Sequence, residues 1–383
     1  MKKFAVWLVC LLVAWLMAFP AMAEDDAIRP RLLDTCALTL SKQPTNIKSI
    51  TPMPDGGVAV FYLTSAPKKG QQEYRLDVFA VDGTRLLAKN LGRSKVAESE
   101  SGPFPYGQII LQSDRFLCEY YPDITTMEVY RQTAYRYNGK AIGKEKTRRL
   151  KFGLATYARP VGDFMVRTLA HAGEEPYPTP IPYRTTELIH IPTGQSVSLL
   201  LYDWSFCSFA DDRGCLFIAQ CNENDNLELR RYDPADGMAE TVTEFDKACF
   251  DGINDPYVGS AVCMDGKAWL KIRRTNEESL ILIIDTAQGA ITASYTLHAA
   301  EGKLQRAGEV LLAVDGWHMD ETLQCMLYRA DILHADLTRT PLALAYEDCI
   351  FMHADGASGV LTTVAVRADG ASYVLCRYAI SAP

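Results

Sequence analysis

The sequence predicts an all-β fold built from about seven repeats of a four-stranded antiparallel unit. The first observation is a hairpin signature at residues 73–91, EYRLDVFAVDGTRLLAKNL, where two runs of β-forming residues flank a turn at Asp82-Gly83. The second is that similar pairs of runs recur about every 51 residues down the chain. The third is that no segment sustains a 3.6-residue apolar period, which predicts few helices.

Turn signals place the units in order along the chain. The expected ranges are 46–91, 104–150, 153–201, 204–245, 256–297, 301–346 and 348–380. In units one to three, the turn pairs that separate the strands are Pro54–Gly57 with Asp82-Gly83, Ser113-Asp114 with Asn138-Gly139, and Gly162-Asp163 with Thr193-Gly194. In units four to six they are Asp211–Gly214 with Pro234–Gly237, Asp265-Gly266 with Ala287–Gly289, and Gly308-Glu309 with Asp331–Thr338.

The last unit has a turn at Asp355–Gly359 and then only one more strand, 372–380, so it lacks its fourth strand. The segment 31–40, RLLDTCALTL, is a spare strand that precedes the first unit. Unpaired sheet edges invite aggregation, so we expect this segment to complete the last unit. Two runs, Leu280–Ile284 and Val310–Val314, are apolar at every position. That pattern is typical of strands packed on both faces.

These repeats resemble the seven-bladed β-propellers of the broad WD40-like and quinoprotein-like group, over nearly all of residues 31–380. The similarity lies in the repeat period, the strand pattern and turns such as FAVDGTRL, HIPTGQSV and IDTAQGAI. The resemblance implies a β-propeller of four-stranded antiparallel blades, with the ring closed by the N-terminal strand pairing with the last blade. The Trp-Asp, kelch and quinoprotein tryptophan signatures are absent, so no family function is carried over.

The first 23 residues have the pattern of a signal peptide. Lys2 and Lys3 precede an apolar run, Phe4–Phe19, and Ala21-Met22-Ala23 places small residues at a cleavage site. An uncleaved anchor is the alternative. A lipoprotein is disfavoured because Cys10 follows a valine within the run. We therefore expect a secreted or extracytoplasmic protein with one propeller domain at 24–383 and no membrane span after cleavage.

Composition and cysteine spacing exclude some classes of partner and cofactor. The formal net charge is −8 and no basic block is present, which argues against nucleic acid and anionic membranes as partners. Ten cysteines follow the signal segment, with no Cys-x-x-Cys pair to suggest zinc or redox chemistry. Two disulfides are hypotheses, Cys207–Cys215 across a turn and Cys36–Cys376 across the closing strands. The other cysteines are expected to be buried thiols.

Long connections predict a binding face. On a propeller, the loops between second and third strands share one face with the connections between blades, and short turns occupy the other. The segments expected on the long-loop face are Gly92–Pro105, Ala170–Arg184, Cys221–Asn226, Asp246–Pro256 and Asp315–Thr322. Binding residues are commonly found on such loops.

Two of these loops carry the candidate contact residues. Ala170–Arg184 is rich in proline and includes His171, Glu174, Glu175, Tyr177 and Tyr183. It is interpreted as a binding loop or as a rigid surface spacer. Asp315–Thr322 gathers Trp317, His318 and Asp320, which suit contact with a protein or a sugar. The alternative for Trp317 is packing against a blade.

Metal binding and catalysis have little support. Asp251, Asn254 and Asp255 offer three oxygen ligands for calcium, but such residues are also ordinary turn material, so no metal or cofactor is expected. Gly-x-Ser-x-Gly and His-Glu-x-x-His are absent. The leading hypothesis is a non-enzymatic scaffold that recognises a protein or glycan through its long-loop face. The alternative is a propeller glycoside hydrolase or polysaccharide lyase, with carboxylates drawn from Glu174, Glu175, Asp203 and Asp320.

Overall fold

The computed structural model describes residues 27–66, 71–95, 107–112, 114–120, 130–138, 142–150, 155–169, 183–202, 206–250, 253, 256–274, 278–297, 302–321, 325–367 and 372–381. Within these ranges the chain is almost entirely β-strand. Two short 3-10 helices, η2 (Pro234–Asp236) and η3 (Lys247–Phe250), complete the described secondary structure. No described helix has the length and apolar character that spanning a membrane requires. The predicted all-β class is confirmed.

Five separate four-stranded antiparallel sheets follow one another along the chain. The first sheet is β2 (Asn46–Pro52), β3 (Val58–Ser65), β4 (Gln71–Phe79) and β5 (Arg85–Lys95), and the second is β6 (Gly107–Gln112), β7 (Arg115–Tyr120), β8 (Tyr130–Tyr137) and β9 (Ile142–Leu150). The third is β10 (Ala155–Val161), β11 (Phe164–Leu169), β12 (Tyr183–His190) and β13 (Ser196–Tyr202). The fourth is β14 (Phe206–Ala210), β15 (Leu216–Cys221), β16 (Leu227–Asp233) and β17 (Ala239–Phe245). The fifth is β18 (Tyr257–Met264), β19 (Lys267–Arg273), β20 (Ser279–Asp285) and β21 (Ala290–Leu297).

The rest of the chain forms one eight-stranded sheet, here called the combined sheet. Its strands are β22 (Lys303–Ala307), β23 (Val310–Asp320), β24 (Cys325–Leu333), β25 (Arg339–Pro341), β26 (Cys349–Asp355), β27 (Val360–Val366), β28 (Tyr373–Ala379) and β1 (Arg31–Leu38). The sequence predicted two separate units here. They are joined by a single residue pair, Tyr328 with Cys349, because β24 runs on past the end of β25 and leaves an edge that β26 can meet.

The N-terminal strand pairs with the last strand of the chain, as the spare-strand argument predicted. β1 lies antiparallel to β28, from Arg31 opposite Ala379 to Leu38 opposite Tyr373. Directly after β1, Ser41 donates its hydroxyl to Asp77 Oδ1 of the first sheet at 2.8 Å. The Tyr62 hydroxyl donates to the other oxygen of that buried carboxylate at 3.2 Å. The N-terminal segment is therefore bonded to both the combined sheet and the first sheet.

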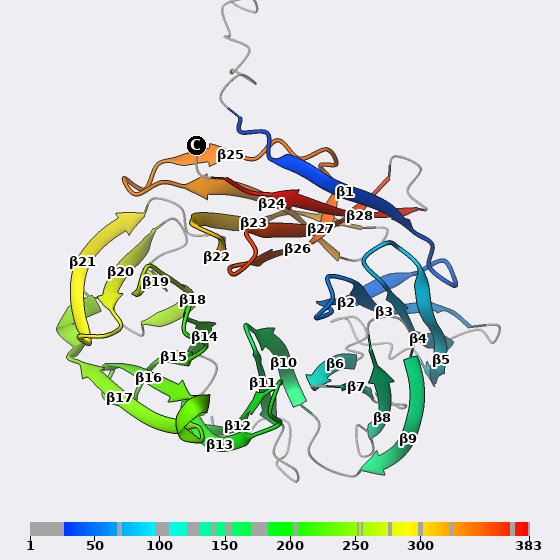
Figure 1. Cartoon of the computed structure of the whole chain (residues 1–383), viewed down its shortest axis with the longest axis horizontal. Helices are drawn as coiled ribbons and strands as arrows, with labels where there is room; N and C mark the ends of the chain where they lie inside the picture. The colour runs from blue at the N-terminus through cyan, green and yellow to red at the C-terminus, as the bar shows by residue number, and fades with distance from the viewer. Residues whose placement is uncertain are drawn as a thin grey trace, which may run out of the picture.

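The sheets are arranged around a common centre, with β2, β6, β10, β14, β18 and β22 innermost in their sheets (Figure 1). Consecutive members of this inner set contact one another, and β22 also contacts β26. Polar side chains bond across these inner edges. Arg159 of β10 donates to Ser208 Oγ of β14 at 2.8 Å, and the Leu304 N–H of β22 donates to Ser260 Oγ of β18 at 3.0 Å. The result is a propeller-like arrangement.

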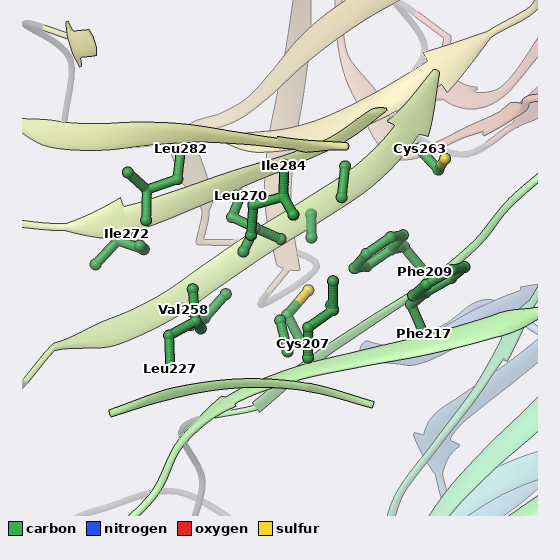
Figure 2. Close-up of a cluster of buried hydrophobic side chains, with 14 of the residues drawn as sticks. Cys207, Phe209, Phe217, Leu227, Val258, Cys263, Leu270, Ile272, Leu282 and Ile284 are labelled. Atoms are coloured by element: carbon green, nitrogen blue, oxygen red, sulfur yellow. The ribbon is translucent and has the colours of Figure 1, made fainter. Parts of the chain in front are cut away.

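The hydrophobic core is divided among the spaces between neighbouring sheets. One cluster fills the junction of the fourth and fifth sheets, where Phe217 and Leu227 face Val258, Leu270 and their neighbours (Figure 2). Both sheets contribute many fully buried residues to this cluster. Other clusters join the first to the second sheet and the fifth sheet to the combined sheet. Strands that are apolar on both faces are explained by this packing, because each sheet contacts a neighbour on either side.

The junction of the second and third sheets has a different composition. From the third sheet, Met165 is the buried contributor to the adjoining apolar cluster. Arg167 of the third sheet reaches across and donates to Glu119 of the second sheet at 2.8 Å. Glu119 is 0% exposed and also accepts from Gln132 at 2.7 Å. Arg167 donates to Glu187 at 2.9 Å as well. A buried ion pair therefore joins these two sheets.

Several of the predicted turns are held by aspartate side chains. Asp82 Oδ1 accepts from the N–H of Thr84 at 2.9 Å, and Asp211 Oδ1 accepts from the N–H groups of Arg213 and Cys215. Gly83 has φ near +80°, a conformation that glycine adopts without steric cost. The Asp/Gly signals in the sequence therefore correspond to carboxylate-capped turns.

Neither proposed disulfide is present. All ten cysteines from Cys36 to Cys376 in the described ranges are free thiols. Cys207 lies opposite Ala219, while Cys215 precedes the first residue of β15. In the closing pair, Thr35 rather than Cys36 lies opposite Cys376. A register displaced by one residue turns each side chain to the other face of a sheet, so the two thiols are not aligned.

Candidate functional site

The two strands β23 and β24 extend beyond β22 and β25 as a two-stranded ribbon, which pairs with β26 at Tyr328 opposite Cys349. The pairing of β22 with β23 stops at Val314. β25 pairs with β24 only at residues 331–333. We call residues 315–320 and 325–330 the β23–β24 ribbon. The pairs His318 with Leu327, Met319 with Met326 and Asp320 with Cys325 continue the ladder to its tip.

The ribbon corrects one sequence interpretation. Residues 315–322 were expected to form a loop because they are polar and carry Asp and Gly. Instead, β23 continues to Asp320, because β24 supplies backbone partners along this whole stretch. Such pairing outweighs the low strand propensity of the individual residues. The tip remains on the predicted long-loop face, since it joins a second strand to a third.

One part of the ribbon is anchored in the core. Leu327 is buried in a cluster with Val60 of the first sheet and Leu375 of the combined sheet, and Cys325 packs against the same cluster. Met326 lies over the backbone of Gly316, where an added Cβ would come within 2.6 Å of its Cγ. These contacts fix the ribbon against the first sheet and against β28 of its own sheet.

Another part of the ribbon is exposed. Met319 is 48% exposed and His318 is also exposed, whereas Asp320 is partly buried. Trp317 lies at a β-bulge between Gly316 and His318, and its side chain is outside the described residues. The structure thus brings His318 and Asp320 to one rigid element, together with Met319, which sequence reasoning did not select.

Burial and a nearby carboxylate favour the neutral forms of two groups at this site, the Cys325 thiol and the Tyr373 hydroxyl. Burial and, to a smaller extent, the Asp320 carboxylate raise the pKa of the Cys325 thiol to about 11. Burial also raises the pKa of the Tyr373 hydroxyl, with added contributions from Cys325 and Asp320. A thiol whose pKa is raised is a poor nucleophile at neutral pH. The described groups at this site therefore suit binding better than covalent catalysis.

The remaining candidates lie largely outside the described residues. This applies to His171, Glu174, Glu175 and Tyr177 of the proline-rich segment, to Asp203, and to Asp251, Asn254 and Asp255. Tyr183 begins β12 opposite Tyr202, but its side chain is not among those described. No three His, Cys, Asp or Glu side chains in the described ranges are placed to hold a metal ion. The carboxylate pairs considered for glycoside cleavage stay predictions.

A pocket of about 530 Å³ opens on the opposite, short-turn face, between the fourth and fifth sheets. The sequence did not predict this pocket, because its size depends on the distance between turns that belong to two different sheets. We call it the turn-face pocket, and its lining residues are Asp211, Asp212, Arg213, Phe217, Leu229, Arg231, Thr241, Thr243, Cys263, Asp265, Gly266, Thr286, Ala287, Gln288 and Gly289. The charged turn sequences DDRG and MDGK were the available signal.

Two arginines near the turn-face pocket are engaged by protein groups. Arg231 donates to Asp233 at 2.9 Å and to the Cys215 sulfur at 3.1 Å. Arg306 of β22 pairs with Asp212 and donates to the Cys263 carbonyl at 3.0 Å. The pKa of the Cys263 thiol is raised to about 12, first by burial and then by Asp211 and Asp212, with Arg306 acting in the opposite direction. Two carboxylates and an arginine therefore act on the thiol at the pocket floor.

Comparisons with known proteins give no family. No family model matches the chain, and no curated protein matches it. A chain in the crystal structure of a mitotic checkpoint complex is similar at 11% identity and a TM-score of 0.49, covering 95% of this chain and 98% of that one. The Saccharomyces cerevisiae protein Sqt1 is similar at 9% identity and a TM-score of 0.40, covering 93% and 100%.

A third solved structure, the acylaminoacyl peptidase of Pyrococcus horikoshii, is similar at 8% identity and a TM-score of 0.48. This chain is covered over 84% of its length and spans 49% of that protein. Likenesses at these scores carry no argument about activity or partners. The fold description rests on the sheets and their packing, and function must come from the sites.

Proposed function

We propose that the chain is an exported, non-enzymatic scaffold, a closed seven-bladed propeller that binds a protein through the face carrying the β23–β24 ribbon. The observation that carries this proposal is the ribbon itself. Leu327 anchors it in the core while Met319 stays 48% exposed on the same two strands. A rigid element that presents an apolar side chain loses little conformational entropy on binding.

The propeller part of the proposal treats the combined sheet as two blades. β22 to β25 form one blade, and β26 to β28 with β1 form the other. The two are joined through the single pair Tyr328–Cys349, which is far less than the ladders within each half. With the five separate sheets, this division gives seven blades, and β1 then supplies the outer strand of the last.

A protein partner is favoured over a glycan by the chemistry of the described ribbon residues. Met319 and Met326 have flexible thioether side chains that adapt to apolar protein surfaces. Glycan recognition would rest on Trp317 as a stacking platform, and its side chain is not described. Export is proposed from the signal-like residues 1–23 alone, which precede the described region.

Photocrosslinking tests the proposal directly. A benzophenone amino acid is placed at position 319 of residues 24–383, and the protein is exposed to the secreted and surface proteins of its source. The matched control carries the same group at Val242 of β17, which is 49% exposed on a strand of another sheet. We expect a discrete protein adduct from position 319 and none from position 242.

The crosslinked partner is then identified by mass spectrometry, purified and titrated. Met319→Asp and Trp317→Ala are each expected to weaken its binding by more than about tenfold, with little change in Tm. Val242→Asp should bind as the parent does. Equal adducts from both positions would contradict the site, and binding to a glycan array with no protein adduct would replace the protein partner by a carbohydrate.

A further inference from the structure

The turn-face pocket is independent of the ribbon. It is lined by the turns at one end of the strands of the fourth and fifth sheets, whereas the ribbon tip lies at the other end of its strands in the combined sheet. Its volume of about 530 Å³ is within the range of sites that hold small ligands or single side chains. The pocket therefore offers a second place where a partner can be bound.

The walls of the pocket are preformed. Asp211 Oδ1 accepts from the N–H of Arg213 at 2.9 Å and from that of Cys215 at 2.8 Å, which fixes the turn after β14. Asp285 Oδ1 accepts from the N–H groups of Ala287 and Gln288, each at 2.9 Å. The Thr286 hydroxyl donates to the Gly266 carbonyl at 2.8 Å and joins the two turns of the fifth sheet. Binding would need little rearrangement.

The floor of the pocket is apolar. Phe217, Leu229 and Cys263 are all buried members of the cluster between the two sheets. Phe217 stacks on Phe209 with ring centroids 5.3 Å apart, and the two rings lie side by side in Figure 2. An aliphatic or planar group could pack on this floor, and an aromatic ring attracts a cation placed over its face.

The rim of the pocket favours a cation. Arg231 is already bonded to Asp233, and Asp212 is already paired with Arg306. No described residue forms an ion pair with Asp265, which is exposed at the rim with φ of 52°. After burial, Asp211 and Asp212 raise the pKa of the Cys263 thiol at the floor, while Arg306 lowers it. Arg213 also lines the pocket, but the three lining carboxylates, Asp211, Asp212 and Asp265, outnumber its two arginines, so a positive group would complete the charge balance.

The geometry points to a binding site for a basic side chain, arginine or lysine, presented by an extended segment of a partner protein. Its aliphatic stem would pack on Phe217 and Leu229, and its charged head would lie at Asp265. The hydroxyls of Thr241 and Thr243 line the pocket on the side of β17 and can bond the backbone of the segment. The apolar floor thus suits the aliphatic stem of a basic residue, the carboxylate suits its charged head, and the hydroxyls suit the peptide backbone.

Selection from a random decapeptide display library tests this inference with residues 24–383 as bait. We expect the recovered peptides to share an arginine or lysine at one position. Replacing that residue by citrulline or norleucine in the synthetic peptide should weaken binding by about tenfold or more, because a charge-assisted bond is lost. Asp265→Asn, which suits the left-handed φ, should have the same effect.

Two control variants separate the pocket from other surfaces. Asp163→Asn removes an exposed carboxylate from the corresponding turn of the third sheet and should leave peptide binding unchanged. Met319→Asp, which tests the ribbon, should also leave it unchanged, so failure of one site is distinguishable from failure of the other. Recovery of no basic consensus, or of peptides that bind Asp265→Asn as tightly as the parent, would overturn the proposal.

Discussion

Two junctions between neighbouring sheets are built from different chemistry. The fourth and fifth sheets meet through buried apolar residues from both sides, such as Phe217 and Leu270. Where the second and third sheets are described, the third sheet contributes buried Met165 and partly buried residues such as Ile189 to the apolar contact, and the ion pair of Glu119 with Arg167 adds a charged one. Neighbouring sheets therefore pack in one case through apolar residues and in the other through apolar residues supplemented by a buried ion pair.

The difference teaches which substitutions each junction should tolerate. An apolar junction depends on filled volume, so removing methylene groups is costly and shape-conserving exchanges are cheap. A buried ion pair contributes little net stability compared with apolar residues of similar size, but removing one partner leaves a buried charge uncompensated. The charged junction should therefore be sensitive to single substitutions and tolerant of paired ones.

The largest expected effect comes from breaking the pairing of β1 with β28. Deleting residues 24–42 removes β1 from β28 and also removes Ser41, leaving the buried Asp77 carboxylate with fewer donors. We expect loss of the cooperative thermal transition, or aggregation through the exposed edge. Calorimetry checks this. A truncated chain that melts within a few degrees of the parent would mean that the sheet junctions suffice without β1.

The next effect separates the charged junction from the apolar one. Glu119→Leu should lower the free energy of unfolding by about 3 kcal/mol, because Arg167 is only 13% exposed, loses its buried partner and keeps only the partly exposed Glu187. The double variant Glu119→Leu/Arg167→Met should recover much of that loss. Urea unfolding measures both. If the double variant were less stable than the single one, the ion pair would not be acting as a compensated charge.

The apolar junction should show the opposite pattern. Leu270 is fully buried, so Leu270→Ala should cost about 2–5 kcal/mol by leaving a cavity. Leu270→Met, which keeps the volume, should cost less than about 1.5 kcal/mol. The same urea assay applies. Equal losses for the two substitutions would argue that shape, rather than filled volume, decides the stability of this junction.

Lowering the pH should weaken the fold where it depends on a charged carboxylate, and the effect is smaller than that of the substitutions above. Glu73 is buried, which raises its pKa, but hydrogen bonds from Arg93 and Arg75 outweigh burial and lower the pKa below its ordinary value of 4.5. A lowered carboxyl pKa stabilises the fold above that value, and the contribution is lost as pH falls through the pKa of the folded state. Stability should therefore fall with acidification from about pH 5 to pH 3.

The variant Glu73→Gln should reduce this dependence, because it removes the titrating group. Leu270→Ala is the control and should be less stable at every pH with the parent slope. Urea unfolding at several pH values measures both slopes. A Glu73→Gln slope equal to that of the parent would assign the acid sensitivity to other carboxylates.

The smallest expected effect is a change in the rate at which two buried thiols, one at each junction, react with a labelling reagent. Burial raises the pKa of Cys263, at the apolar junction, to about 12, and burial also raises the pKa of Cys118, beside Glu119. Both should react slowly with thiol reagents in the native protein. Leu270→Ala should speed labelling of Cys263 more than that of Cys118, and Arg167→Met should do the reverse. Peptide mass spectrometry resolves the two sites, and uniform acceleration would indicate global unfolding.

Local signals in the sequence predicted much of the fold. Turns such as Asp82-Gly83 lie where expected, because a capping carboxylate and a glycine specify a turn within a few residues. The pairing of β1 with β28 followed from counting strands. The junction chemistry was not predicted, since whether Glu119 meets Arg167 depends on how two sheets, distant in sequence, face each other.

The candidate sites were predicted less well than the fold. His318 and Asp320 were selected, but as loop residues, because the backbone partners of β23 are not visible in its own polar sequence. Met319 was not selected, since exposure cannot be read from one residue type. The turn-face pocket was missed because its walls come from turns that are well separated along the chain. The Cys36–Cys376 hypothesis failed by one residue of register, because Thr35 lies opposite Cys376, and the Cys207–Cys215 hypothesis failed because Cys207 lies opposite Ala219.

The pairing of β1 with β28 also has a kinetic consequence. Thr35 and Cys376 lie side by side although 341 residues separate them in the chain. Closing so long a loop carries an entropic cost before any contact compensates for it, and topologies rich in such contacts fold slowly. The last step of folding should therefore be the arrival of β1 at β28. Until that step, the outer edge of β28 is an open template for another chain, so dilution should raise the yield of refolding.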